Sequence, residues 1–223
     1  ESAGFISPLW QRTPRDIGVF VGVSYNNYQL FLADAMKKMA HYSVGSQTYS
    51  IANRISYLFN FIGPSFALDT ACSSSLFAIH QACESIRHGS TSLALAGGVN
   101  LSLHPSKYVT LCASGFASSK GHCHAFAADG DGLVPSEGVG VVLLKSLVQA
   151  RADGDKILAV IKGSGVSQDG RTQGYTVPNP VAQSRAIEAA LDQAGVHPET
   201  ISYVEAHGTG TALGDPIEIQ GLV

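Results

Sequence analysis

Residues 69–76 read Asp-Thr-Ala-Cys-Ser-Ser-Ser-Leu and place Cys72 where a predicted strand meets a predicted helix. The apolar run 66–68 comes before them, and apolar residues at helical spacing follow. A thiol at such a turn meets unpaired N–H groups and the positive end of the helix dipole, which favour the thiolate. Cys72 is therefore a candidate nucleophile whose neighbouring N–H groups could bind an oxyanion. The same local sequence also fits a buried structural cysteine, since free cysteine packs as a small apolar residue.

A second stretch whose residues could take part in a reaction begins at residue 205 and reads Glu-Ala-His-Gly-Thr-Gly-Thr. His207 follows the apolar run 201–206, which predicts a buried strand, and a Gly/Thr loop follows the histidine. A histidine that only makes hydrogen bonds within a turn would give the same local pattern. Because Cys72 and His207 each stand at the carboxyl end of a predicted strand, together they favour a nucleophile and base pair.

The elements that must position these residues alternate along the chain. Predicted strands cover 17–22, 66–70, 93–103, 138–145, 157–165 and 201–206, and predicted helices cover 28–40, 48–59, 73–88, 105–113, 181–194 and a stretch from about 215. The Gly97-Gly98 pair breaks the run 93–103 into two short strands or a strand with a bulge. Several strands are apolar on both faces, which predicts an α/β layered fold whose sheet is covered on each side. No linker-like segment divides the chain, so we expect one domain or part of one.

Composition excludes several classes of function. Charged residues make up 14% of the chain and the formal net charge is −3, which gives no electrostatic basis for binding nucleic acid or an anionic membrane. No apolar run reaches the length of a membrane span, and no signal peptide opens the chain. The four cysteines form no CxxC pair, a pattern that fits a reducing compartment, so we expect a cytoplasmic location.

A metal site is not expected. Cys123 stands between His122 and His124, but three adjacent side chains cannot all face one ion without a loop. No second pair of ligands follows at the spacing of a zinc site.

With these motifs in place, the chain resembles the ketosynthase domain of modular polyketide synthases, within the thiolase-like β-ketoacyl synthase family. The resembling segments are the nucleophile motif at 69–76, the Ala-Asp-Gly…Glu-Gly region at 128–140, the loop before the substrate-side helix at 174–180 and the first histidine motif at 205–211. Residues 177–180 and 134–135 resemble synthases whose acyltransferase acts in trans. The resemblance implies a thiolase-like layered fold (αβαβα), which would be incomplete here.

The resemblance also implies a mechanism. Cys72 would take an acyl chain from a carrier protein, and a malonyl-type extender would lose CO₂ and attack the resulting thioester. His207 would help to hold the enolate oxygen, and the Cys72 N–H would supply one oxyanion donor. The resemblance assigns Thr209 and Thr211 to the pantetheine arm and Asn179 to substrate binding.

Two acidic residues, Asp215 and Glu218, match positions that lie behind the family's site, near a lysine. No cofactor would be bound directly, since the substrates are carried on the 4′-phosphopantetheine of an acyl carrier protein. Other implied partners are a second copy in a homodimer and the neighbouring synthase domains.

Residues 1–223 are expected to be a partial ketosynthase domain, cut at both ends: its N-terminal half with the nucleophile and the start of its C-terminal half. The family's second histidine, its active-site lysine and a Gly/Phe-rich loop would lie downstream. Three alternatives stay open: a non-elongating ketosynthase that passes chains on, a noncatalytic segment for carrier docking or dimerisation, and a Cys/His hydrolase. Intact Cys72 and His207 speak against the noncatalytic segment, and no orienting partner can be placed for the hydrolase.

Overall fold

The computed structural model describes residues 15–38 and 46–223. The chain forms two compact units, one made of Glu1–His104 and Ser136–Val160 and the other of Pro105–Pro135 and Ile161–Val223. The sequence indicated no such division. The physical reason is that the chain passes between the units three times, after residues 104, 135 and 160, without a change in composition at those points.

The first unit is built on a four-stranded sheet with the strand order β2-β1-β3-β4. The strands are β1 Ile17–Gly22, β2 Ser65–Leu68, β3 Leu93–Asn100 and β4 Gly138–Lys145. The first three strands are mutually parallel, and β4 pairs with β3 in the antiparallel sense. Every residue of β1 is buried, which agrees with the sequence pattern of a strand that is apolar on both faces.

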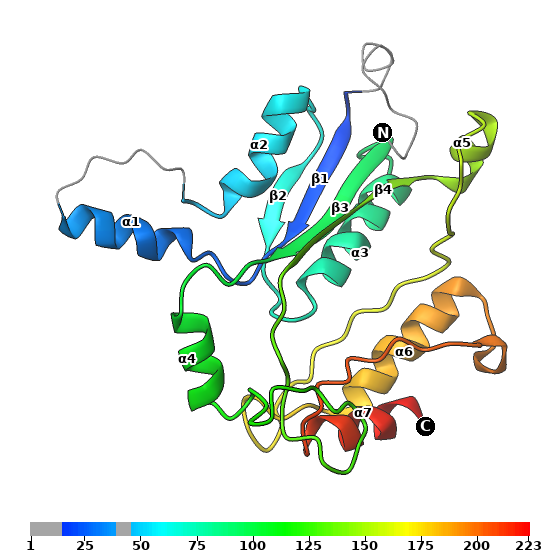
Figure 1. Ribbon diagram of the computed structural model, residues 1–223. Coiled ribbons are helices and arrows are strands. Elements are labelled where there is room, and N and C mark those ends of the chain that lie inside the picture. The colour runs from blue at the N-terminus through cyan, green and yellow to red at the C-terminus, as the bar shows by residue number, and fades with distance from the viewer. Residues whose placement is uncertain (1–14, 39–45) are drawn as a thin grey trace. The chain divides into compact units, whose positions relative to one another are not determined.

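Two helices cover the two faces of this sheet (Figure 1). Val19 and Val21 of β1 pack with Ala52 of α2 (Tyr49–Phe59), and Phe20 packs on the other face against Ala78 of α3 (Ser74–Arg87). Successive residues of a strand point to opposite faces, so one strand serves both cores. The first unit is therefore layered as predicted, helix on sheet on helix.

Two shorter helices belong to the first unit as well, α1 (Tyr28–Lys37) and α5 (Leu147–Ala152). The predicted end of α1, residues 39–40, lies outside the described residues.

Two glycines determine how closely α3 approaches the sheet. A Cβ atom at Gly22 would lie 2.4 Å from the carbonyl carbon of Ser74, and one at Gly98 would lie 2.8 Å from the Cβ of Ser75. The first turn of α3 therefore rests directly on the carboxyl ends of β1 and β3, and the turn that carries Cys72 comes immediately before it.

The Gly97-Gly98 pair does not interrupt β3. The strand pairs with β4 without a break from Leu93 to Asn100, so the predicted bulge or division is wrong. A Cβ atom at Gly97 would lie 2.0 Å from the carbonyl oxygen of Gly140. Glycine is required there because the backbone of the neighbouring strand is close, a requirement that a sequence pattern cannot distinguish from a bulge.

The second unit contains α4 (Ser106–Ala113), α6 (Pro180–Ala194), the 3₁₀ turn η2 (Pro198–Thr200) and α7 (Gly214–Leu222), with irregular chain between them. Helix α6 begins after Asn179 and ends at Gly195 in the left-handed conformation, the usual glycine position after a helix. Helices α6 and α7 are joined where the Ser184 hydroxyl donates to the carbonyl of Gly221 at 2.9 Å.

The strands predicted at 157–165 and 201–206 are wrong for this structure, because neither segment pairs with a strand among the described residues. Part of the first segment lies on α6 instead: a Cβ atom at Gly165 would lie 1.9 Å from the carbonyl oxygen of Ala186. Apolar side chains remain open along both stretches, with Leu158 84% and Tyr203 74% exposed. An apolar pattern predicts that a segment is buried, but it does not show whether a neighbouring strand is present to pair with it.

Candidate functional site

Cys72 follows a residue with an unusual backbone. Ala71 has φ 54°, the left-handed region that side chains other than glycine rarely occupy. Its N–H donates to the Asp69 carboxylate at 2.8 Å, and its carbonyl accepts from the Ser74 hydroxyl at 2.6 Å and from the Ser24 hydroxyl at 2.9 Å. Strained residues persist where the surroundings hold them, and they cluster at functional sites.

The Cys72 side chain is exposed, which argues against the alternative of a buried structural cysteine. It stands two residues before α3 begins at Ser74. Cys83, further along the same helix, shows the contrasting case, because burial raises the pKa of its thiol and disfavours the thiolate. Of the two cysteines, Cys72 is the one that a substrate could reach, and its role as a nucleophile stays a prediction.

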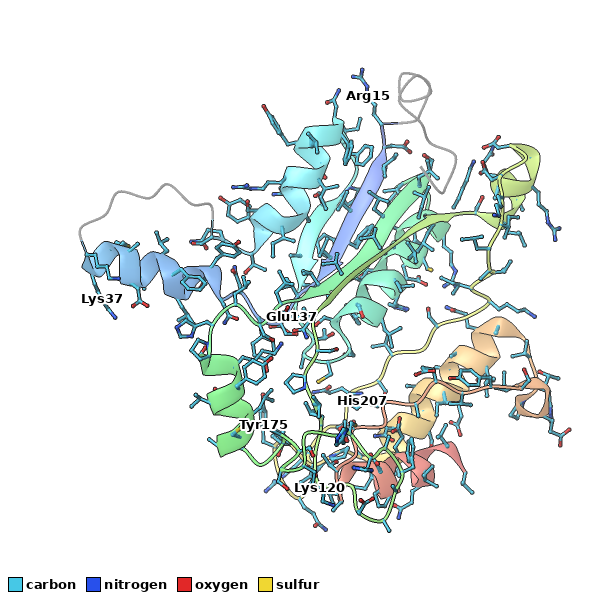
Figure 2. The ribbon with its side chains drawn as sticks, viewed as in Figure 1. Arg15, Lys37, Lys120, Glu137, Tyr175 and His207 are labelled. Carbon is cyan, nitrogen blue, oxygen red and sulfur yellow. The ribbon has the colours of Figure 1, made fainter. Side chains whose placement is uncertain are left out.

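In the second unit, His207 is held through its backbone by Glu218. The Glu218 carboxylate accepts the N–H of His207 at 2.5 Å and the N–H of Gly208 at 2.8 Å. His207 itself is exposed and lies on the segment that leads into α7 (Figure 2). A carboxylate that binds two successive N–H groups fixes the direction of the chain at the histidine.

Asp215 is the buried anchor of the same turn, with 7% of its surface exposed. One carboxylate oxygen accepts the N–H of Gly210 at 3.1 Å, and the other accepts the N–H of Phe126 at 2.6 Å. A buried carboxylate is stable only when its oxygens are hydrogen-bonded, and this one also lies in the first turn of α7, where the helix dipole favours negative charge.

The hydroxyls of Thr209 and Thr211 are turned toward each other, with their oxygens 2.9 Å apart. The Thr211 hydroxyl also accepts the N–H of Gly214 at 3.0 Å, and the Thr209 hydroxyl lies 3.4 Å from the Asp215 carboxylate. Both hydroxyls therefore support the turn, and their role at a pantetheine arm stays a prediction.

Asn179 uses both ends of its side-chain amide within the second unit. Its oxygen accepts the N–H of Val181 at 3.1 Å, which caps α6, and its nitrogen donates to the carbonyl of Asp169 at 2.9 Å. The segment 168–177, which it anchors, lines an open pocket. Its predicted role in substrate binding stays a prediction, whereas its contacts are those of a helix cap.

The structure thus brings five of the predicted residues into one hydrogen-bonded turn: His207, Thr209, Thr211, Asp215 and Glu218. Cys72 belongs to the first unit, and Asn179 lies elsewhere in the second. Sequence reasoning missed Phe126, which binds Asp215 through its N–H and has φ 59°. No sequence signal marks it, since a left-handed residue is foreseen only when it is glycine or asparagine.

Within the described ranges, no group of three or more His, Cys, Asp or Glu side chains is arranged to hold a metal ion. The rings of His122 and His124 lie 6.1 Å apart, and His124 faces the Asp129 carboxylate at 3.7 Å. None of the helices in the described part of the chain is both long and apolar enough to cross a membrane.

Two family models match the sequence. One, described as "Beta-ketoacyl synthase, N-terminal domain", matches residues 1–150, and the other, described as "Beta-ketoacyl synthase, C-terminal domain", matches residues 158–223. Together they cover most of both units, and the first model includes residues 105–135 of the second unit.

Curated relatives and solved structures agree with this match. Polyketide synthase PksM of Bacillus subtilis is 54% identical over 228 residues, which cover 100% of this chain and 5% of that protein. Polyketide synthase ThaG of Burkholderia thailandensis is 54% identical over 206 residues, 92% of this chain and 4% of that protein. The oxazolomycin ketosynthase domain OzmH KS7 of Streptomyces albus superposes with a TM-score of 0.89 at 51% identity, covering 92% of this chain and 36% of that one. The chain thus spans about a twentieth of the curated relatives.

Proposed function

Because the chain belongs to the β-ketoacyl synthase family of condensing transferases, we propose that its parent domain elongates acyl chains within a polyketide synthase. The observation that carries the proposal is the exposed Cys72 thiol, set directly after the left-handed Ala71 and before the first turn of α3. A nucleophile must be reachable by its substrate, and the positive end of a helix favours its thiolate.

In the proposed first step, the Cys72 sulfur attacks the thioester of an acyl chain carried on the phosphopantetheine of an acyl carrier protein. The bond between the acyl group and Cys72 forms as the bond to the carrier breaks, and the carrier leaves as a free thiol. The tetrahedral intermediate carries a negative oxygen, for which the Cys72 N–H is the proposed donor.

In the second step, a malonyl-type extender on a carrier loses CO₂, and the electron pair of the broken bond becomes an enolate. His207 stabilises the enolate oxygen, and Glu218 supports it by holding the peptide groups on both sides of the histidine. The carbanion carbon then attacks the Cys72 thioester, which releases the thiolate and leaves a 3-oxoacyl chain on the carrier.

The test uses the full parent domain with the variants Cys72→Ala and His207→Ala. Intact-protein mass spectrometry measures acylation of Cys72, and release of labelled CO₂ measures decarboxylation of the malonyl carrier. We expect Cys72→Ala to form no acyl adduct, and acyl loading that persists on this variant contradicts the nucleophile assignment. We expect His207→Ala to acylate but to decarboxylate about 100-fold more slowly.

The same measurements separate the alternatives. A non-elongating ketosynthase acylates Cys72 but forms no 3-oxoacyl product from the malonyl carrier. A noncatalytic segment for carrier docking or dimerisation shows neither reaction. An equal loss of both reactions in His207→Ala indicates that His207 mainly activates the thiol.

The partners follow from the same proposal. The parent domain works on carrier-bound substrates beside the neighbouring synthase domains, and it forms a homodimer. A domain that stays monomeric in sedimentation at working concentration contradicts the dimer.

A further inference from the structure

We propose that Phe126 is a positioning residue for His207, acting through Asp215 and the turn at residues 208–210. The inference rests on the proposed function, because it concerns the histidine that is assigned there to enolate stabilisation. Phe126 lies on the irregular stretch 118–133, called here loop 118–133, which belongs to the same unit as His207.

The backbone of Phe126 is held in an unfavourable conformation. Three residues other than glycine have positive φ in the described part of the chain: Asn60, Ala71 and Phe126. Asn60 ends helix α2, a position that asparagine tolerates, and Ala71 precedes the proposed nucleophile. A bulky side chain in this region is rare, so the surroundings of Phe126 must compensate for it.

The compensation comes from Asp215. The N–H of Phe126 donates to one oxygen of this buried carboxylate at 2.6 Å, while the other oxygen accepts the N–H of Gly210 at 3.1 Å. One carboxylate therefore ties loop 118–133 to the turn that follows His207, and the N–H that it binds in the loop belongs to the left-handed Phe126.

The Phe126 ring completes the contact. A Cβ atom at Gly208, the residue after His207, would lie 3.3 Å from a ring carbon of Phe126. The Cys123 thiol donates to the carbonyl of Gly208 at 3.7 Å, and the N–H of Gly132 donates to the carbonyl of Gly210 at 3.0 Å. The turn is thus held by Glu218 of α7 and, independently, by loop 118–133.

The exposure of Phe126 distinguishes this role from core packing. Its side chain is 47% exposed, so removing it takes away less buried surface than the loss of a core phenylalanine such as Phe20 at 2%. The ring lies beside Gly208, the residue that follows His207. A misplacement of about 1 Å in a catalytic group can reduce a rate by about 100-fold, so a small local effect is sufficient.

The main test variant is Phe126→Asn in the full parent domain. Asparagine tolerates positive φ and keeps the N–H to Asp215, so it removes the ring alone. We expect kcat for decarboxylation of the malonyl carrier to fall about 10- to 100-fold with little change in KM, while acylation of Cys72 stays within about 3-fold of the wild type. We expect Phe126→Tyr, which keeps the ring, to restore the rate.

Asp215→Asn tests the hydrogen bonds that join Phe126 to the turn after His207. In either orientation the amide places its NH₂ group against a backbone N–H, of Phe126 or of Gly210, so one hydrogen bond is lost without a change in size. We expect the same selective loss of decarboxylation. The matched control is Asp129→Asn in the same loop, which removes an exposed carboxylate that pairs with Lys120 and should leave both reactions unchanged.

His207→Ala, measured in parallel, distinguishes the positioning role of Phe126 from the proposed role of His207 itself. A selective loss in His207→Ala with no loss in Phe126→Asn and Asp215→Asn overturns the positioning role and leaves the proposed function intact. An equal fall of both reactions in Phe126→Asn, accompanied by a lower melting temperature, also overturns it. No selective loss in His207→Ala overturns the proposed role of His207 and the positioning role with it.

Discussion

Ser74 links the left-handed turn before Cys72 to the helix after it. Its side chain is nearly buried, at 5% exposure, and its hydroxyl accepts the N–H of Thr70 at 2.9 Å and donates to the carbonyl of Ala71 at 2.6 Å. These two bonds secure the strained peptide on which the direction of the thiol depends. The neighbouring hydroxyl of Ser75, by contrast, belongs to an exposed residue.

Ser74→Ala should therefore affect both stability and chemistry in the parent domain. It removes the acceptor of the Thr70 N–H and one of the donors to the Ala71 carbonyl, which keeps the Ser24 hydroxyl as a partner, at a cost of about 0.5–1.5 kcal/mol per hydrogen bond in the free energy of unfolding. Acyl loading of Cys72 should slow as well. Urea unfolding and adduct formation measure the two effects, with Ser75→Ala as the matched control. Equal behaviour of the two serine variants would show that the hydroxyl does not hold the turn.

Residue types and spacing indicated Cys72 and His207 as candidates, and their catalytic roles stay predictions. They also pointed to Asp215 and Glu218, through a resemblance. The left-handed backbones of Ala71 and Phe126 could not be predicted, because only glycine or asparagine in a sequence indicates a positive φ. The hydrogen bond from Phe126 to Asp215 joins residues 89 positions apart, so no local pattern contains it.

Among the elements, β1 and α3 carry the Cys72 turn, and Phe20 joins them. Phe20 is 2% exposed and packs against Ala78 and Ala82 of α3. Phe66 on the edge strand β2 meets the Phe20 ring edge-to-face with centroids 5.1 Å apart, but it is 36% exposed. Phe20 thus occupies a core position and Phe66 an edge position, although the two rings are in contact.

Phe20→Ala should lower the free energy of unfolding of the parent domain by about 3–5 kcal/mol, because it opens a cavity beneath α3. Phe66→Ala should lower it by less, since part of that ring is already in water. Guanidinium unfolding of both variants gives the comparison. A loss that is as large at Phe66 as at Phe20 would place the main support of α3 at the edge of the sheet.

The junction of β4 with α5 depends on charge. Lys145 at the end of β4 donates to the carboxylates of Asp153 and Asp155. Hydrogen bonds from Lys145 and Gln149 lower the pKa of Asp153 below its ordinary 3.8. Burial acts to lower the pKa of Lys145, but the hydrogen bonds to both aspartates outweigh it and raise that pKa above 10.5. Lys145 and Asp153 are therefore both charged between these limits.

Because the pKa of Asp153 is depressed in the fold, its contribution to stability is present above about pH 4 and is lost as pH falls through the folded value. Because the pKa of Lys145 is raised, its contribution is present below about pH 10 and is lost as pH rises through the folded value. Lys145→Met should therefore lower the melting temperature near pH 7 and converge with the wild type toward pH 3. Lys37→Met, at an exposed pair with Asp34, should show little effect at either pH.

The strands of the first sheet were foreseen with nearly correct bounds, since β1, β3 and β4 are apolar runs that find neighbours within the chain. The segments 157–165 and 201–206 have the same apolar character but no ladder partner among the described residues. A strand exists only as part of a pair, whereas a helix closes its own hydrogen bonds. Helices were for this reason the safer predictions.

For the molecule as a whole, apolar surface remains open over both units. Tyr57 is 91% exposed and Leu158 84% in the first unit, and Tyr203 is 74% exposed in the second. Large apolar side chains are usually buried in folded proteins, so this degree of exposure is typical of residues that other protein covers. Such coverage fits a chain that spans about a third of the solved ketosynthase domain it resembles.

The 223-residue chain expressed alone should accordingly self-associate and catalyse no condensation. Light scattering after gel filtration should give a mass well above 23.3 kDa, and a dye that binds apolar surface should fluoresce strongly. A monodisperse monomer with a cooperative melt would contradict this expectation. Any 3-oxoacyl product formed by the chain alone would contradict it as well.

The close seating of α3 on Gly22 and Gly98 also bears on protein engineering. A carbon atom at either glycine would collide with the first turn of the helix, so neither position can be varied in a library that aims to change the surroundings of Cys72. Leu76, one turn beyond Cys72 and 70% exposed, carries no such restriction. Substitutions at Leu76 can therefore change the surface near the Cys72 thiol. They leave the distance between α3 and the sheet unchanged, and with it the position of the sulfur.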